Sequence, residues 1–191
     1  MLNFFKKTWK PLAKLSWVLA IFVVAYWLTS LVQENGAVRD IVFDLGYLGV
    51  LLLSLVSGFN LLVPIPAVSF VPVFVEAGLS IWIIIFFIIV GTSIADSVSY
   101  VIGILGRGFA KSWEHKKLFR KLDELRSKHY WAPIVVLFFF ATLVPLPNEL
   151  ILVPLGFMGY KIRHVLISYI AGNIIFATLT SLGIIRIFNI I

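Results

Sequence analysis

The stretch from Phe140 to Tyr160 limits most strongly what this chain can fold into. It reads FATLVPLPNELILVPLGFMGY, which is apolar enough to enter a bilayer but carries three prolines and an Asn-Glu pair. Proline removes a backbone donor and clashes with the preceding turn, so a continuous helix through Pro145 and Pro147 is disfavoured. Asn148 is a good N-cap, and Glu149 suits the first turn of a new helix, where the helix dipole favours negative charge. The stretch therefore predicts two half-helices joined by a polar tip inside the membrane.

A second copy of this pattern lies 81 residues earlier in the chain. Pro64 and Pro66 fall on Pro145 and Pro147, and the alignment continues without a gap over residues 59–94, with ten identities in 36 positions. Apolar segments match by chance at some positions. A matching Pro-x-Pro and two matching glycines at one offset are much rarer accidents, so we interpret the pattern as an internal duplication.

The composition places these hairpins in a membrane protein. Of the 191 residues, 61% are hydrophobic and only 13% are charged. A soluble domain of this length has too little interior to bury so much apolar surface, and lipid-exposed backbone must satisfy its own hydrogen bonds. We therefore expect an all-α integral membrane protein. In so apolar a chain, the net charge of +7 indicates contact with the membrane surface and not with nucleic acid.

The order of apolar and charged segments predicts four parts. An apolar run at 15–32 is long enough to span, and no small-residue cleavage site follows it, so we expect it to be retained as a helix. Residues 1–44 hold a basic cytoplasmic segment, this first transmembrane helix and a polar link at 33–44. Residues 45–106 hold the first re-entrant hairpin and a span at 79–105. Residues 107–130 form a basic amphipathic helix on the cytoplasmic membrane surface, and residues 131–191 hold the second re-entrant hairpin and a last span from 162.

The basic residues predict the orientation of these parts. If both proline segments return to their own side, 14 of the 16 Lys and Arg residues lie on one face, and only Arg39 and Arg186 lie on the other. If each segment crossed fully, the basic clusters would be split between the two faces. We expect the protein to lie in the cell (inner) membrane, and the positive-inside pattern places its N-terminus in the cytoplasm. The hairpins then enter from opposite faces, as an inverted repeat of the kind found in many secondary transporters.

One helix adds a resemblance to a known family. Residues 91–103 read GTSIADSVSYVIG. With Gly91, Asp96, Tyr100 and Gly103, this segment resembles the G-x-x-x-(G/A)-D-x-x-x-Y-x-x-G helix of the DedA family, also called VTT or SNARE-associated Golgi proteins. The two proline hairpins, the basic turn 106–108 and the later Gly-Asn pair at 172–173 follow in the order typical of that family.

The resemblance covers roughly residues 45–185 and implies a protein that moves or scrambles lipids. Its relatives include flippases for the undecaprenyl phosphate carrier and phospholipid scramblases. Many bacterial members carry arginines around the second hairpin tip, where this chain has Thr142 and Asn148. This chain therefore looks like a divergent member of the family.

Five residues are candidates for substrate contact or coupling: Glu149, Asn148, Asp96, Arg107 and Arg163. Glu149 ranks first because an ionisable group at membrane depth is costly, although a carboxylate stabilised by its own helix N-terminus is the simpler alternative. Asp96 stays open between a role in the site and a pairing with Arg107 or a backbone donor. For Asn148 we favour simple capping, and for Arg107 and Arg163 anchoring at the headgroups.

These features predict a transporter of a lipid or lipid phosphate, with anionic headgroups binding at the half-helix N-termini. Proton coupling is a further hypothesis, because a charged Glu149 would repel an anionic headgroup at the same helix end. A proton-coupled transporter of small solutes or ions on the same scaffold is the alternative. We expect no enzymatic activity, metal or cofactor, because no catalytic constellation or metal-ligand spacing occurs. A homo-oligomer and a purely structural adaptor stay open.

Overall fold

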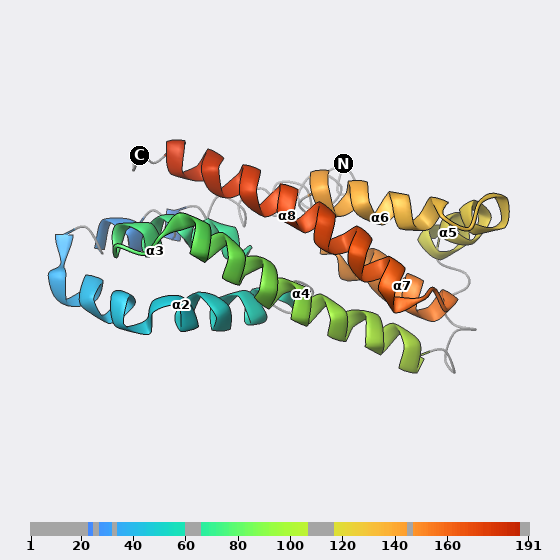
Figure 1. Ribbon diagram of the computed structural model, residues 1–191, viewed down its shortest axis with the longest axis horizontal. Helices are drawn as coiled ribbons and strands as arrows, with labels where there is room; N and C mark the ends of the chain where they lie inside the picture. Colours follow the sequence, from blue (N-terminus) through green and yellow to red (C-terminus); the bar gives the residue numbers. More distant parts are fainter. Residues whose placement is uncertain are drawn as a thin grey trace, which may run out of the picture.

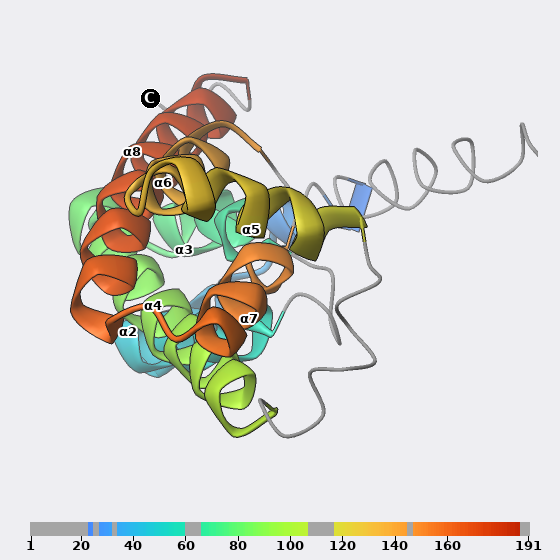
Figure 2. The same cartoon turned by 90° about the vertical axis from the view of Figure 1, so that its right-hand side faces the viewer.

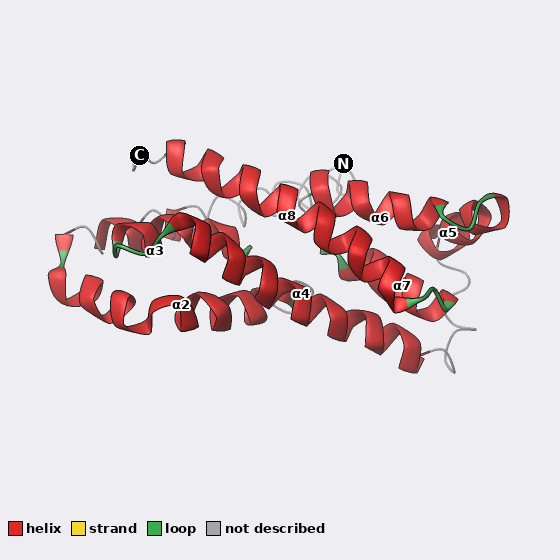
Figure 3. Cartoon of the chain, in the orientation of Figure 1, coloured by secondary structure: helices red, strands yellow, loops and turns green. Residues whose placement is uncertain are grey.

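The computed structural model describes residues 23–24, 27–31, 34–59, 66–106, 117–144 and 147–187. Within these ranges the chain consists of helices and short connections, without a strand (Figure 3). Three helices are long and apolar enough to cross a membrane, namely α2 (Gly36–Gly58), α4 (Ile81–Leu105) and α8 (Ile162–Ile187). The expectation of a helical membrane protein is confirmed for this part of the chain.

Helices α4 and α8 run the length of the molecule, and shorter elements fill its two ends (Figure 1). One end holds α2, the short η1 (Ala67–Phe70) and α3 (Val71–Glu76). The other end holds α5 (Lys117–Lys128), α6 (Ala132–Leu143) and α7 (Glu149–Met158). Seen from that end, α6 and α8 lie on one side of the bundle, and α4 and α7 lie on the other (Figure 2).

The buried apolar side chains form two clusters, one towards each end. The first joins η1 and α3 to the beginning of α4 and the end of α8, around Val71 and Ile84. The second joins α6 and α7 to the end of α4 and the beginning of α8, around Leu137 and Leu152. Each pair of short elements therefore packs against opposite halves of the same two long helices.

Helix α2 is divided by a kink at Gly46. Its φ of 49° and ψ of −144° are non-helical, and only glycine adopts this conformation without strain. The arm after the kink, residues 47–58, is about 18 Å long at 1.5 Å per residue, close to half of a roughly 30 Å hydrocarbon core. The predicted polar link at 33–44 is wrong from Gly36 onwards, because Asn35 caps the helix by accepting from the N–H groups of Ala37 and Val38.

The long helices approach the shorter ones at glycines. A Cβ added at Gly91 would lie 2.6 Å from the Cβ of Ser54 in α2, and one added at Gly172 would lie 2.7 Å from the carbonyl oxygen of Phe138 in α6. Gly103 in α4 and Gly156 in α7 lie directly against each other's backbone. A side chain at any of these positions would push two helices apart.

The second proline segment is broken as expected, but not at every proline. Helix α6 ends at Leu143 and α7 begins at Glu149, on the two sides of Pro147. Pro154 lies inside α7 without ending it. Because proline has no N–H, the Leu150 carbonyl loses its usual helical donor there. Pro64 and Pro145 lie outside the described residues, as does most of the predicted first span at 15–32, of which residues 23–24 and 27–31 are helical.

Candidate functional site

Asp96 lies on the buried face of α4, between the part of α4 that packs against α2 and the part that packs against α7. Ala95 beside it packs against Gly58 at the end of α2, and Tyr100, one turn later, belongs to the cluster with α6 and α7. The Asp96 side chain is only 1% exposed. A carboxyl group in this position is costly unless polar groups surround it, so its neighbours define the candidate site.

Polar groups of α7 and α8 face this carboxyl. Asn148 Nδ2 donates to Asp96 Oδ2 over 3.4 Å, which is a long hydrogen bond. The Tyr169 hydroxyl is close enough to interact with the carboxyl but does not meet the geometry of a hydrogen bond. Asp96 Oδ1 has no hydrogen-bond partner among the described residues, and no described Lys, Arg or His forms an ion pair with it. The expected pairing with Arg107 stays a prediction, because Arg107 lies outside the described residues.

Asn148 has a different role from the one its sequence position favours. It occupies the N-cap position of α7, but its side chain makes no capping hydrogen bond, and its φ of −65° and ψ of −23° are helical. A capping residue normally has extended backbone angles that turn its side chain back to the helix N–H groups. Here the side chain reaches across to α4 instead. The expectation of simple capping is therefore wrong for this side chain.

Glu149 is the first residue of α7 and is buried, with 7% of its surface exposed. Its position in the first helical turn matches the prediction. It is also close enough to Asp96 for the two carboxyl groups to interact electrostatically. Two acidic side chains from different helices thus lie near each other in the interior. The sequence of neither helix alone predicts this proximity.

A second polar contact joins α4 to α8 one turn before Asp96. Asn173 Nδ2 donates to Thr92 Oγ1 over 2.8 Å, and Thr92 Oγ1 donates to the Ile88 carbonyl oxygen over 2.8 Å. The two partners are separated by 81 residues, which is the offset of the internal repeat. Equivalent positions of the two long helices therefore touch at the crossing point.

A cavity of about 140 Å³ opens at this crossing. Pro66 lines it from one proline segment and Pro147 from the other. Its polar lining comes from α2, α4, α8 and the start of α7: Ser57, Thr92, Asp96, Asn148, Tyr169 and Asn173. A cavity needs about 10–15 Å³ of such space to hold one water molecule, so this cavity has room for a small hydrated group.

Several predicted residues lie away from the cavity. Arg163 is exposed at the start of α8. Gly91, Tyr100 and Gly103 are buried packing residues, and the Tyr100 hydroxyl donates to the Tyr160 carbonyl oxygen. They position the helix that carries Asp96, which gives the resembling motif a structural explanation.

The sequence analysis assigned no role to Tyr169, Thr92 or Ser57. Asn173 entered only through the family-like Gly-Asn pair. The repeat carried a signal for Thr92 and Asn173, because both are polar and lie 81 residues apart in apolar helices. No comparable signal distinguishes Tyr169 from any other aromatic residue in a transmembrane helix.

Helix α5 secures the outer end of α7. Arg126 Nη1 donates to the Met158 carbonyl oxygen over 2.7 Å, and its guanidinium lies 5.3 Å from the centre of the Tyr160 ring. Burial raises the pKa of the Tyr160 phenol, and the nearby Arg126 charge partly offsets this rise. Leu122 is buried on the same side of the helix. The basic helix predicted at the membrane surface is thus also a structural support for the second hairpin.

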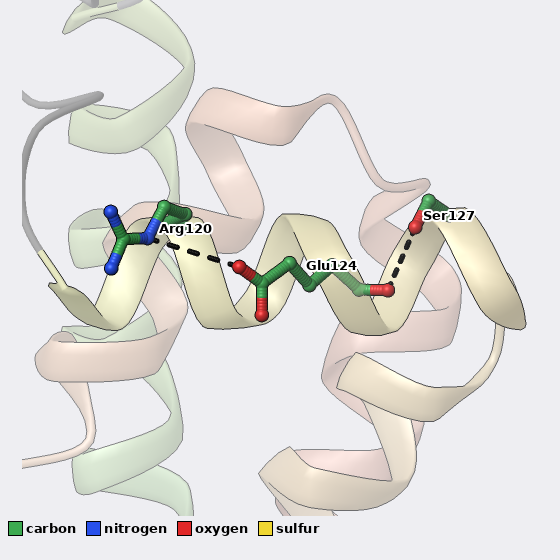
Figure 4. Close-up of polar contacts among 3 residues, drawn as sticks. All are labelled: Arg120, Glu124 and Ser127. Carbon is green, nitrogen blue, oxygen red and sulfur yellow. Dashed lines mark hydrogen bonds and ion pairs between the residues drawn. The ribbon is translucent and has the colours of Figure 1, made fainter.

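The opposite face of α5 carries a polar contact of another kind. Arg120 Nε and Glu124 Oε1 lie 3.8 Å apart, and the Ser127 hydroxyl donates to the Glu124 carbonyl oxygen over 2.8 Å (Figure 4). Both charged side chains are mostly exposed, so their ion pair contributes little, on the order of 0–1 kcal/mol. This face remains available to the surroundings.

The described residues contain no group of three or more His, Asp or Glu side chains that could hold a metal ion by themselves. No family model, curated protein or solved structure matches the chain. The functional assignment therefore depends on the geometry of the cavity and on the sequence resemblance.

Proposed function

We propose that this protein is a membrane transporter of the DedA type, which moves a lipid across the bilayer through the polar cavity between its two proline segments. The observation that carries the proposal is the position of that cavity. It lies where two membrane-crossing helices meet, between Pro66 and Pro147, and it contains a buried carboxyl group. Ionisable groups at membrane depth mark substrate and ion pathways, and broken helices bring such groups together in transporters.

The proposal includes two re-entrant hairpins arranged as an inverted repeat. In support, the two sets of short elements lie at opposite ends of the molecule (Figure 1). Helices α6 and α7 have 12 and 10 residues, or about 18 and 15 Å, so each reaches only part of the way through the bilayer. The arm of α2 after Gly46 has a similar length to α6.

The local geometry also repeats. Gly78 and Gly159 are 81 residues apart, and both have positive φ, at 102° and 75°. The following helices begin at Ile81 and Ile162, again with the same offset. These pairs support a common origin of the two halves.

The contacts of α2 and α6 with the long helices depart from that offset. Gly91 contacts Ser54 in α2, whereas Gly172 contacts Ala141 in α6, which is 87 residues later. In the sequence, the first proline of the tip therefore follows the contact point six residues later in the first repeat than in the second. A gapless alignment does not reveal this difference, because it follows the proline tips and not the packing surface.

The charge distribution supports the proposed orientation in the cell membrane. Helix α5 contacts the end of α7, and Arg163 begins α8 at the same end of the molecule. Arg39 near the start of α2 and Arg186 near the end of α8 lie at the other end. Cytoplasmic loops carry the excess of positive charge, so the end with α5 is the cytoplasmic one.

The second candidate is a proton-coupled transporter of small solutes or ions on the same scaffold. The size and charge of the cavity favour it, because about 140 Å³ is small for a whole lipid headgroup and no basic side chain belongs to the described lining. The expected binding of anionic headgroups has no counter-charge there. In a lipid transporter, the cavity would have to open further or hold only part of the headgroup.

Reconstitution in liposomes distinguishes the two candidates. We expect the full-length protein to move fluorescent lipids between leaflets, and the Asp96→Asn variant to move them much more slowly. Ser93→Ala is the matched control, because Ser93 lies on the same helix but outside the cavity lining. Proton flux without any lipid movement would support the small-solute alternative and overturn lipid transport.

A further inference from the structure

The buried carboxyl group of Asp96 has no basic side chain beside it among the described residues. The segments 47–106, 130–160 and 165–185 contain no Lys, Arg or His at all. They include both proline tips and nearly the whole length of the helices around the cavity. Asp96 is only 1% exposed, and Glu149 interacts with it from α7. Any positive charge that balances this site must therefore come from outside these segments.

The hydrogen bonds around the cavity leave acceptors available. Asp96 Oδ1 and the Tyr169 hydroxyl form no hydrogen bond of good geometry with any described residue, although the two groups are close enough to interact with each other. Asn173 uses its amide nitrogen on Thr92, so its carbonyl oxygen is free to accept. A buried carboxyl oxygen without a donor is costly, which makes it a pointer to a donor or cation from outside the protein.

The size of the cavity limits the nature of that group. Its volume of about 140 Å³ is roughly ten times the 10–15 Å³ that one water molecule needs. This is enough for a partly hydrated ion or for a short aminoalkyl group. Oxygen ligands of a carboxylate, a phenol and an amide are suited to a hard monovalent cation or an ammonium group.

We propose that the cavity binds a monovalent cation, either an alkali-metal ion or the primary ammonium group of a lipid headgroup, with Asp96 as the anionic ligand and Tyr169 and Asn173 as neutral oxygen donors. This inference depends on the proposed function only for the use of the site in transport, and not for the existence of the site. Protons compete with the cation at Asp96. Among the described residues, Glu149 and Tyr169 are the titratable groups that face it, and α2 contributes none.

The test measures binding without transport. The purified full-length protein in a neutral detergent is titrated with sodium chloride, potassium chloride or ethylammonium chloride, and choline chloride keeps the ionic strength constant. We expect at least one small cation to raise the midpoint of thermal unfolding saturably, with weaker apparent affinity at low pH. Asp96→Asn should weaken the affinity at least tenfold, Tyr169→Phe should weaken it severalfold, and Ser93→Ala should leave it unchanged.

The outcomes separate the sources of the cation. A response to sodium or potassium alone indicates an ion site, and a response to ethylammonium indicates a headgroup amine. If no cation exceeds choline, or if Asp96→Asn and Tyr169→Phe both bind as the wild type does, the proposal is overturned. The same holds if glycerol phosphate, and no cation, stabilises the protein saturably. Should Asp96→Asn fail to fold, Tyr169→Phe still decides the question.

The liposome assay keeps this inference distinct from the proposed function. Cation binding by a protein that moves no lipid retains the site and refutes lipid transport. Lipid movement by a protein that binds no cation retains transport and refutes the site.

Discussion

The contact between Gly103 and Gly156 makes a sharp prediction about how the second hairpin is held. A methyl group at Gly103 would collide with the carbonyl oxygen of Val153 and would lie 3.1 Å from the Cα of Gly156. Both are backbone atoms, which cannot rotate away as a side chain can. Gly103→Ala therefore requires α4 and α7 to separate. The matched control is Gly183→Ala in α8, where an added Cβ meets nothing within 4 Å.

The expected difference follows from two opposing effects. Replacing glycine with alanine inside a helix stabilises it by about 1 kcal/mol in both variants. Only Gly103→Ala adds overpacking, which costs about 1–3 kcal/mol. The two variants should therefore differ by about 1–3 kcal/mol in free energy of unfolding. At roughly 2–4 °C per kcal/mol for a chain of this size, Gly103→Ala should melt about 2–12 °C below Gly183→Ala.

The assay is thermal unfolding of the purified proteins in one detergent, with lipid transport measured on the same preparations. Because α7 begins with Glu149 and its N-cap Asn148 contacts Asp96, moving α7 should also slow transport. Equal melting midpoints together with equal transport for the two variants would refute the close packing of α4 on α7. Equal midpoints with reduced transport in Gly103→Ala alone would restrict the error to the energetic reasoning.

Three further predictions concern topology, coupling and the surface helix. Single cysteines replacing Lys128 and Lys161 in this cysteine-free chain should react with an impermeant reagent from the same side of the membrane, and reaction from opposite sides would contradict the re-entrant second hairpin. Glu149→Gln should keep the fold and substrate binding but lose the pH dependence of transport, so a wild-type pH profile would remove Glu149 from coupling. Arg126→Gln should lower stability by about 1–3 kcal/mol through its lost hydrogen bond, measured by thermal unfolding. Arg120→Gln, its exposed counterpart, should change stability by less than about 1 kcal/mol, and an equal loss in both would refute the supporting role of α5.

The sequence could predict the features that depend on local chemistry. Proline geometry indicated the break between α6 and α7, and the charge of Glu149 indicated the first turn of α7. The cost of an intramembrane carboxylate singled out Asp96. The kink at Gly46 was missed because a glycine within an apolar run is compatible with a straight helix, and its left-handed backbone angles have no sequence signature there.

The features that depend on helix packing could not be predicted. The rotation of α4 against α8 decides whether Thr92 meets Asn173, and nothing in either helix fixes that angle. The same limit explains the error at Asn148. Its residue type favours capping through the carbonyl oxygen, but its amide nitrogen donates to the buried carboxyl group on α4, and the side chain makes no capping hydrogen bond. Tyr169 lies one helical turn before Asn173, but a tyrosine in a transmembrane helix does not by its residue type indicate a site.

The contact between Thr92 and Asn173 also has a consequence for biosynthesis. At a ribosomal rate of about 5–20 residues per second, the 81 residues between them take about 4–16 s to synthesise. Asp96 is made early in that interval, Asn148 later and Tyr169 only near its end. We expect the nascent chain to keep this carboxyl group in contact with water or with the insertion machinery until α8 arrives. The arrival of α8 would then allow the assembled protein to leave the insertion machinery for the lipid.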